Sequence, residues 1–307
     1  MTGSLQFLIK NSKREDKVMI LRIRHLTTYS YNHPVVLEPH CLRLTPRADS
    51  YSSLLERQLN ITPEPCSVSL SVENDGSMSH WVRFKGETSS LTVESKMTIS
   101  LIPDKNPFYF LIYPPSCLKL PMAYPSELLA ELRPFLMEDN IPPPVQEFAF
   151  EVLTEAGEET MNFLVMLAQR IKRDFVYEFR QLGAPHQAED TLSSRRGSCR
   201  DFAILYMAVA RAMGLAARFV SGYYFEENPD LPDLHAWVEV YIPAGGWRGI
   251  DPSLGLACYG HHIALASGAS AETVAPIRGF FLKGHAKTLA AMQLVLEYKY
   301  SALASLA

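Results

Sequence analysis

The sequence predicts an α+β fold in which a β-sandwich precedes a mixed core of helices and strands. Residues 19–102 consist of short apolar and β-branched runs separated by turn signals, which is typical of an antiparallel sandwich. Residues 126–213 then show apolar side chains at helical spacing, and residues 217–300 return to strand patterns. The 307-residue chain is long enough to form two units, each with its own apolar core.

The expected sandwich is built from short strands joined by turns. The strand segments are residues 19–31, 35–44, 54–61, 67–72, 79–84 and 90–101. The last segment shows the clearest alternation, because every second residue from Leu91 to Ile99 falls on one face of an extended chain. Asn74-Asp75-Gly76 is a turn signal between two of these strands.

Changes in composition give the expected domain boundaries. Residues 1–18 hold one short apolar run followed by charged residues and no small-residue cleavage site, so we expect a loose N-terminal extension and no secretory signal. Residues 103–125 are rich in proline, as in a linker or an extended wrap around the body. We therefore assign residues 19–102 to the β-sandwich domain and residues 126–307 to the mixed core of helices and strands.

Two helices stand out in the expected core. Residues 158–175 are amphipathic, and residues 199–213 repeat apolar side chains at three- and four-residue steps before Gly214, which suits a helix C-terminus. Strands are expected next at residues 217–225, 235–242 and 246–250, and the last strand is expected at Met292–Tyr300.

Composition and charge exclude several classes of function. The net charge of −4 gives no reason to expect nucleic acid as a partner. The most apolar stretch, Phe202–Val220, carries Arg211 and Arg218, so we expect no membrane-spanning segment. The chain has 5 cysteines and no C-x-x-C motif, which favours free thiols in a reducing compartment and predicts a cytoplasmic protein.

Cys199 is the candidate nucleophile. It follows Gly197-Ser198 and opens an apolar helix, whose free N–H groups and dipole favour a thiolate. Arg195, Arg196 and Arg200 add positive charge nearby. The alternative is a buried structural cysteine, since most cysteines behave as small hydrophobic residues.

His235 and Asp251 are the candidate partners of Cys199. His235 begins an alternating strand, and a turn at residues 243–246 joins that strand to the next one, which ends at Asp251. The two side chains then lie at the same open end of a hairpin, where a carboxylate can orient an imidazole that acts as general base. A strand-end histidine and an Asp-Pro turn are the structural alternatives.

Taken together, these motifs resemble the bacterial transglutaminase-like superfamily. The resemblance rests on Gly-x-Cys-x-Asp-Phe-Ala, Ala-Arg-x-Val-Ser-Gly-Tyr, His-Ala-Trp-Val-Glu-Val-Tyr and Asp-Pro-Ser, in that order from Gly197 to Ser253. Residues 22–31 and 42–47 are similar to the β domain that precedes this core in bacterial members. The resemblance implies an α+β fold with a papain/transglutaminase-like core preceded by an antiparallel β-sandwich domain.

The resemblance also implies an activity. Cys199 would attack an acyl carbon as nucleophile, with His235 as base, Asp251 as orienting carboxylate and Trp237 as a substrate-binding wall of the groove. The Cys199 backbone N–H would be one oxyanion donor. We expect a cysteine protease or amidase that cleaves a peptide or isopeptide amide through a thioester. The alternatives are transamidation by a protein-glutamine transglutaminase, a non-catalytic peptide-binding module, and acetyl transfer onto arylamines.

No cofactor and no metal are expected. Cys258, His261 and His262 offer only two or three ligands, whereas a structural zinc site usually has four. No calcium loop is visible, so the calcium dependence of animal transglutaminases is not carried over. A peptide or protein substrate is the expected partner, and the oligomeric state is left open.

Overall fold

The protein is described by a computed structural model, in which residues 17–49, 51–102, 107–136, 141–180, 183–225, 234–282 and 287–302 can be described. The expected N-terminal extension, residues 1–18, falls almost entirely outside them. The helices are η1 (Pro115–Leu118), α1 (Ser126–Leu136), α2 (Pro143–Glu155), α3 (Thr160–Asp174), α4 (Ala188–Ser194), α5 (Cys199–Ala212) and η2 (Ala271–Val274). Among the described residues, none of the helices has the length and apolar character needed to cross a membrane.

In the part of the chain that the structure describes, the strands form three antiparallel sheets and one short parallel pair. They are β1 (Lys17–Leu37), β2 (His40–Leu42), β3 (Ser52–Thr62), β4 (Ser67–Val72), β5 (Met78–Arg83), β6 (Glu87–Leu101), β7 (Val176–Tyr177), β8 (Arg196–Gly197), β9 (Ala217–Tyr224), β10 (Leu234–Ile242), β11 (Gly246–Asp251), β12 (Leu256–Ala257), β13 (His262–Gly268), β14 (Ile277–Arg278), β15 (Phe281–Leu282) and β16 (Thr288–Ala302). The α+β prediction is therefore confirmed.

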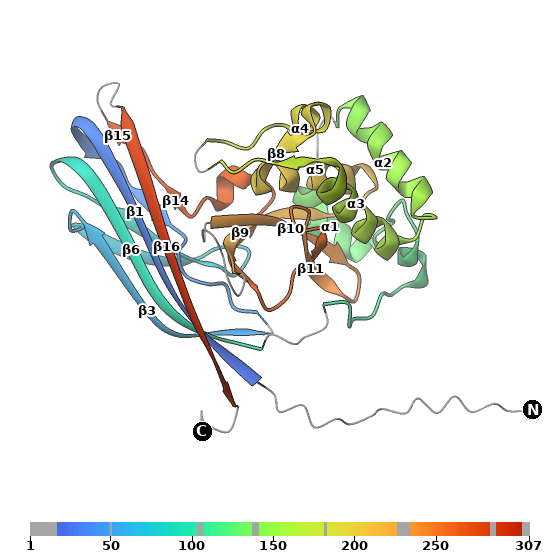
Figure 1. Cartoon of the computed structure of the whole chain (residues 1–307), viewed down its shortest axis with the longest axis horizontal. Helices are drawn as coiled ribbons and strands as arrows, with labels where there is room; N and C mark the ends of the chain where they lie inside the picture. Colours follow the sequence, from blue (N-terminus) through green and yellow to red (C-terminus); the bar gives the residue numbers. More distant parts are fainter. Residues whose placement is uncertain are drawn as a thin grey trace, which may run out of the picture.

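The core sheet has the order β12-β11-β10-β9-β13 and lies between two layers (Figure 1). Phe219, Val238 and Val240 pack in a single apolar cluster with buried residues of α5. Tyr223, further along β9, and Ile263 on β13 join the apolar cluster of the N-terminal strands. The core sheet therefore packs against both the helices and the β domain.

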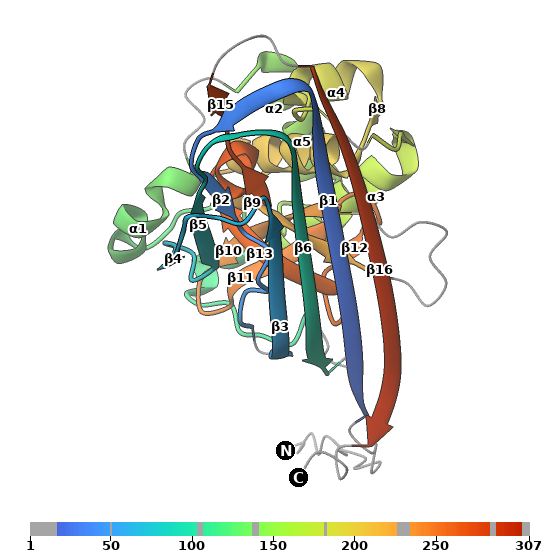
Figure 2. The same ribbon diagram turned by 90° about the vertical axis from the view of Figure 1, so that its left-hand side faces the viewer.

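The N-terminal strands form a long sheet that runs beside the core (Figure 2). Its order is β15-β1-β6-β3, and β16 also pairs with β1 from Lys17↔Ala302 to Tyr31↔Thr288. A second sheet has the order β14-β2-β5-β4. Our sequence boundaries placed Met292–Tyr300 within the segment 126–307, whereas the structure pairs this strand with the N-terminal β1.

Strand β1 is longer than the sequence pattern indicates. Proline at position 34 suggested two strands, residues 19–31 and 35–44, but β1 continues to Leu37. The pairing of β1 with β6 shifts register between Ser30 and Val35. Pro34 has no backbone N–H to contribute to a ladder, and this irregular stretch tolerates it.

The proline-rich segment packs on the core over its described part. Leu120, Met122 and Tyr124 are buried in the same apolar cluster as α5. The Tyr124 hydroxyl donates to the Tyr241 carbonyl oxygen at 2.8 Å and accepts the Ala216 N–H at 2.9 Å. The described part of this segment therefore lies against the core.

A buried ion cluster joins the β domain to the core. Arg47, which follows β2, forms an ion pair with Glu239 on β10, and its Nη1 donates to Ser267 Oγ at 2.6 Å. Arg218 on β9 binds the same carboxylate, with its Nε 2.7 Å from Oε2. Burial would raise the pKa of Glu239, but the two guanidinium groups hold that pKa below its ordinary value. The carboxylate therefore stays ionised between two cations.

Replacing Arg47 by Met is expected to destabilise the fold by about 3–5 kcal/mol, because the buried Glu239 loses one of its two cationic partners. Urea unfolding followed by fluorescence measures the loss. The control is Arg22→Met on β1, an exposed arginine whose replacement should change the free energy of unfolding by about 0.5 kcal/mol or less. Equal effects of the two substitutions would contradict a stabilising role for the cluster.

Candidate active site

Cys199 is held at the first turn of α5 by a capping box. The Ser198 hydroxyl accepts from the backbone N–H of Asp201, while the Asp201 carboxylate accepts from the Ser198 N–H at 2.7 Å. Gly197 is needed just before this turn, since a Cβ there would lie 2.8 Å from the Cβ of Asp201. Cys199 is 5% exposed, so its sulfur lies inside the protein at the N-terminal end of a helix dipole.

Asp201 also ties a neighbouring loop to the start of α5. Its Oδ1 accepts from Arg180 Nη2 at 2.6 Å and from the His186 N–H at 2.7 Å. Burial would raise the pKa of Asp201, but these hydrogen bonds and those from Ser198 keep that pKa below its ordinary value. The sequence showed Asp201 within the Gly-x-Cys-x-Asp motif, but it did not show that the Asp201 carboxylate binds Arg180 and His186 of the neighbouring loop.

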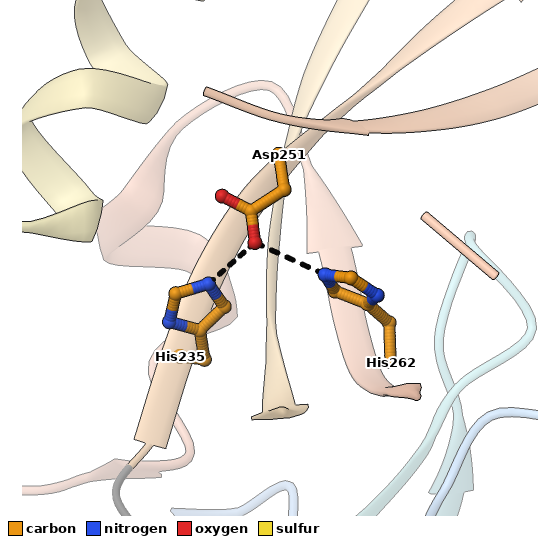
Figure 3. Close-up of side chains that lie close together, drawn as sticks. All are labelled: His235, Asp251 and His262. Carbon is orange, nitrogen blue, oxygen red and sulfur yellow. Dashed lines mark hydrogen bonds and ion pairs between the residues drawn. The ribbon is translucent and has the colours of Figure 1, made fainter. Parts of the chain in front are cut away.

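His235 and Asp251 come together as the predicted hairpin requires. The residues are on the adjacent strands β10 and β11, which pair from Val238↔Ile250 to Ile242↔Gly246. The His235 Nε2 lies 2.6 Å from Asp251 Oδ2 (Figure 3). The Cys199 side chain hydrogen-bonds the same imidazole. Because Nε2 faces the carboxylate, Nδ1 is the ring nitrogen left for the sulfur.

The Asp251 carboxylate is surrounded by hydrogen-bond donors. Its Oδ1 accepts from the Ser253 hydroxyl at 2.6 Å, from the Ser253 N–H at 2.9 Å and from the Leu254 N–H at 3.3 Å. Its Oδ2 accepts from His235 and from a second histidine, His262. The side chain is fully buried, so these donors replace the water that the charge has lost.

His262 is the site residue that sequence reasoning missed. It begins β13, is fully buried, and places Nε2 3.0 Å from Asp251 Oδ2 (Figure 3). Its Nδ1 is buried without a hydrogen-bond partner, so the neutral tautomer with the proton on Nε2 fits this position. The sequence showed a histidine at a strand start, but a pairing between β9 and β13 is not visible in a local pattern.

The charges of the group are linked. Burial would lower the pKa of His235, but the Asp251 carboxylate and the Cys199 sulfur raise it well above its ordinary value. Burial would raise the pKa of Asp251, but His235 and His262 hold it far below its usual range. Burial lowers the pKa of His262, which keeps that ring neutral. The arrangement thus favours an imidazolium between a sulfur and a carboxylate.

Cys199 and His235 open onto one cleft with a volume of about 340 Å³. Residues of the core line one side, and residues of β1 and β16 line the other. Trp237, which we expected as a wall of the substrate groove, is 2% exposed and does not line this cleft. Its ring stacks with the His235 ring, with centroids 6.3 Å apart, and forms a T-shaped pair with the His262 ring, with centroids 5.1 Å apart. In this position it supports the two imidazoles from behind.

Among the described residues, the side chains that could hold a metal ion gather only at His235, Asp251 and His262. Their potential ligand atoms lie within 4.8 Å of one another. The Nε2 atom of each histidine already has a hydrogen bond to the shared carboxylate oxygen, so both nitrogens that face Asp251 are engaged without a metal ion. The residues weighed for zinc do not converge, because His261 Nδ1 lies 3.1 Å from the Phe225 carbonyl oxygen while His262 faces Asp251.

Replacing His262 by Leu is expected to lower kcat about 10- to 100-fold, because Asp251 loses one charge-assisted hydrogen bond that fixes its oxygen toward His235. Substrate should bind as before, so KM should change little. His262→Gln, which can place an amide N–H near the same point, should recover part of the rate. Steady-state kinetics on a fluorogenic amide measures all three enzymes.

The adjacent His261→Leu is the control for the His262 substitutions, because His261 bonds a backbone carbonyl and makes no contact with Asp251. If His261→Leu and His262→Leu lowered kcat equally, the loss would come from general disturbance of the β13 start. A positioning role for His262 would then be wrong.

A Cys–His–Asp series on a helix tip and two adjacent strands, within an α+β core, is the arrangement of a papain-like thiol site. Residues 146–252 match the family described as the Transglutaminase-like superfamily, and residues 21–100 match the Bacterial transglutaminase-like N-terminal region. The chain therefore belongs to the bacterial transglutaminase-like superfamily, as the sequence motifs predicted.

Known proteins share this organisation to different extents. A crystal structure of a proposed cysteine protease from Cytophaga hutchinsonii has the same fold, with a TM-score of 0.67 and 22% identity over 92% of this chain and 91% of that one. An uncharacterized protein of Mycobacterium tuberculosis is 28% identical over 272 residues, which are 84% of this chain and 86% of its own length. A Protein-glutamine gamma-glutamyltransferase of Pseudomonas aeruginosa is 32% identical over 116 residues, 34% of this chain and 17% of its own.

Proposed function

We propose that this protein is a cysteine-nucleophile acyl-transfer enzyme that hydrolyses a peptide or isopeptide amide through a thioester intermediate. The observation that carries the proposal is the series of contacts from the Cys199 side chain to the His235 ring and from that ring to Asp251 Oδ2 at 2.6 Å. A nucleophile, a base and a group that orients the base are the parts that thiol-based acyl transfer requires.

The first half-reaction forms the thioester. His235 holds the thiol proton as an imidazolium while the Cys199 sulfur attacks the carbonyl carbon, and the developing oxyanion is stabilised by the Cys199 backbone N–H at the start of α5. The C–N bond then breaks, and the His235 imidazolium gives its proton to the departing amine. Asp251 holds the ring in the required tautomer throughout and stabilises its charged form.

The second half-reaction releases the acyl group. His235 takes a proton from a water molecule, whose oxygen attacks the thioester carbon, and the C–S bond breaks to give a carboxylic acid and the free thiol. Hydrolysis makes the smallest demand on the cleft, because its second substrate is water. The free thiols of all five cysteines fit the reducing cytoplasm that we propose as the location.

Transamidation is the second candidate. The match to a Protein-glutamine gamma-glutamyltransferase over 116 residues favours it. In that reaction a primary amine takes the place of water and attacks the same thioester. A glutamine peptide incubated with the enzyme, with and without a primary amine, separates the two candidates by mass spectrometry of the products.

The outcomes of this experiment are distinct. A carboxylate product that persists when amine is present supports hydrolysis, and a covalent peptide–amine conjugate supports transamidation. A set of ordinary peptide amides extends the test to backbone cleavage. If the protein bound the peptides but converted none of them, and Cys199 resisted acyl electrophiles, the non-catalytic reading as a peptide-binding module would replace the enzyme proposal.

A further inference from the structure

One wall of the cleft beside Cys199 belongs to the N-terminal β domain. In the pairing of β1 with β16, Thr27 lies opposite Met292 and Tyr29 lies opposite Ala290. Side chains alternate between the two faces of a strand, so these four residues share one face of the sheet. All four line the cleft into which Cys199 and His235 open.

The same face of the sheet closes against the core a few residues further along. His25 and Leu294, the next cross-strand pair, are buried, and Leu294 packs in one apolar cluster with Tyr223 of β9. His25 Nδ1 lies 2.9 Å from the Tyr223 hydroxyl. The cleft therefore has a closed end at His25 and opens toward Tyr29 and Ala290, with the sheet as a fixed wall.

The opposite side of the cleft is also apolar in its described part. Leu234 comes directly before His235, and Val274, Pro276 and Ile277 belong to or adjoin η2 and β14. At the closed end, the His25 Nε2 lies 2.7 Å from Thr27 Oγ1, so the polar atoms there are paired with each other. Burial lowers the pKa of His25 to about 4, and the ring carries no charge near neutral pH.

The charged residues that line the cleft are engaged elsewhere or exposed. Arg180 binds the Asp201 carboxylate, and Arg200 donates to the Gly183 carbonyl oxygen at 2.6 Å. Glu272 is exposed to solvent. A charged substrate side chain buried against Met292, Ala290 and Val274 would lose water without an ionic partner among these apolar residues, which is costly. An apolar side chain would gain from the same burial.

We infer that the Thr27–Tyr29–Ala290–Met292 face of the β1–β16 pair is an acyl-side subsite that selects substrates with an apolar side chain next to the attacked carbonyl. The inference rests on the proposed function of Cys199 and adds a substrate class to it. The cleft volume of about 340 Å³ is at the lower end of the range for ligand pockets, which suits one side chain and its adjoining backbone.

Peptidyl chloromethyl ketones that differ only in the side chain next to the reactive carbon test the subsite on the full chain. The Cys199 sulfur forms a bond to the methylene carbon, the C–Cl bond breaks and chloride leaves. Each attached probe therefore marks one cysteine sulfur that has reacted. Probes carrying Leu, Ser, Glu or Lys are compared by intact mass and peptide mapping. We expect the Leu probe to label Cys199 about 10- to 100-fold faster than the Glu and Lys probes.

Substitutions on β16 test whether this wall sets the selectivity. Met292→Glu should lower the rate at which the Leu probe labels Cys199 by at least about 10-fold. The ratio of the Leu rate to the Lys rate should fall or reverse. Gln293→Glu is the matched control, because it adds the same charge one residue away on the other face of the strand, where the side chain is exposed. Met292→Ala, which stays apolar but leaves more room, should favour a Phe probe over the Leu probe.

The outcomes separate this inference from the proposed function. If Cys199 is labelled rapidly but the four side chains react at equal rates, or a charged probe reacts fastest, the apolar subsite is wrong and the enzyme proposal stands. Equal effects of Met292→Glu and Gln293→Glu would also overturn the subsite. If the exposed Cys66 is labelled as fast as Cys199 by every probe, the nucleophile itself is wrong and the subsite is overturned with it.

Discussion

The Cys199→Ser enzyme is expected to lose at least about 10³-fold in kcat/KM on any amide that the wild type cleaves. Serine preserves the shape of the side chain and the capping box of α5, so the change acts on the chemistry of one atom. A hydroxyl is far harder to deprotonate than a thiol, and an imidazole placed for a sulfur does not make up the difference. Steady-state kinetics and acyl-enzyme trapping by mass spectrometry measure the loss.

Cys66→Ser serves as the control for the Cys199 substitution. Cys66 is exposed and lies outside the site, so its removal should leave kcat/KM unchanged. In the wild type, iodoacetamide should modify Cys199 before Cys66 near neutral pH, although Cys199 is only 5% exposed, because the His235 ring can accept the thiol proton. Full activity of Cys199→Ser, or faster modification of Cys66 than of Cys199 by iodoacetamide, would show that Cys199 is not the nucleophile.

The parts of the site that could be predicted from the sequence are those encoded by neighbours along the chain. Gly197-Ser198-Cys199 marks a helix start, and the capping box with Asp201 follows from that local pattern. His235 and Asp251 belong to one hairpin with a short turn, so their proximity follows from strand pairing alone. These features need only local geometry and the short loop between β10 and β11.

The parts that could not be predicted depend on contacts between distant segments. His262 reaches Asp251 because β13 pairs with β9, on the far side from β10, across a sheet order that no local pattern specifies. The pairing of β16 with β1 joins residues more than 250 positions apart in the sequence, and it is this pairing that gives the cleft its second wall. Trp237 lies in an alternating strand pattern, and that pattern does not tell whether its side chain lines a cleft or is buried beside the rings of His235 and His262.

Asp251→Asn is expected to lower kcat about 10²- to 10⁴-fold while the chain still folds. Every group around the carboxylate is a donor, so the amide NH₂ of asparagine must face either the N–H groups of Ser253 and Leu254 or the two histidines. In the second orientation the NH₂ donates to His235 Nε2, which moves the ring proton to Nδ1. That tautomer presents an N–H to Cys199 and cannot accept the thiol proton.

The same substitution should change the pH dependence in a defined direction. In the wild type the Asp251 carboxylate and the Cys199 sulfur together raise the pKa of His235, whereas in Asp251→Asn only the sulfur opposes the effect of burial, so that pKa should fall. The upper pH limit of the Cys199–His235 ion pair, measured through the rate of Cys199 alkylation, should therefore move to lower pH. A control substitution, Asp174→Asn at the end of α3, lies outside the site and should leave this limit in place.

Protein stability gives an independent test of the charged pair. The folded state of the wild type holds His235 with a raised pKa and Asp251 with a depressed one. The contribution of His235 to the free energy of unfolding is complete below its unfolded pKa of about 6.5 and is lost as pH rises through its folded pKa. The contribution of Asp251 is complete above its unfolded pKa of about 3.9 and is lost as pH falls through its folded pKa. The stability advantage of the wild type over Asp251→Asn should therefore be greatest between about pH 4 and 6.5. An advantage that did not vary with pH would mean that His235 and Asp251 are not an ion pair in the folded protein, and the imidazolium would lose its role in the mechanism.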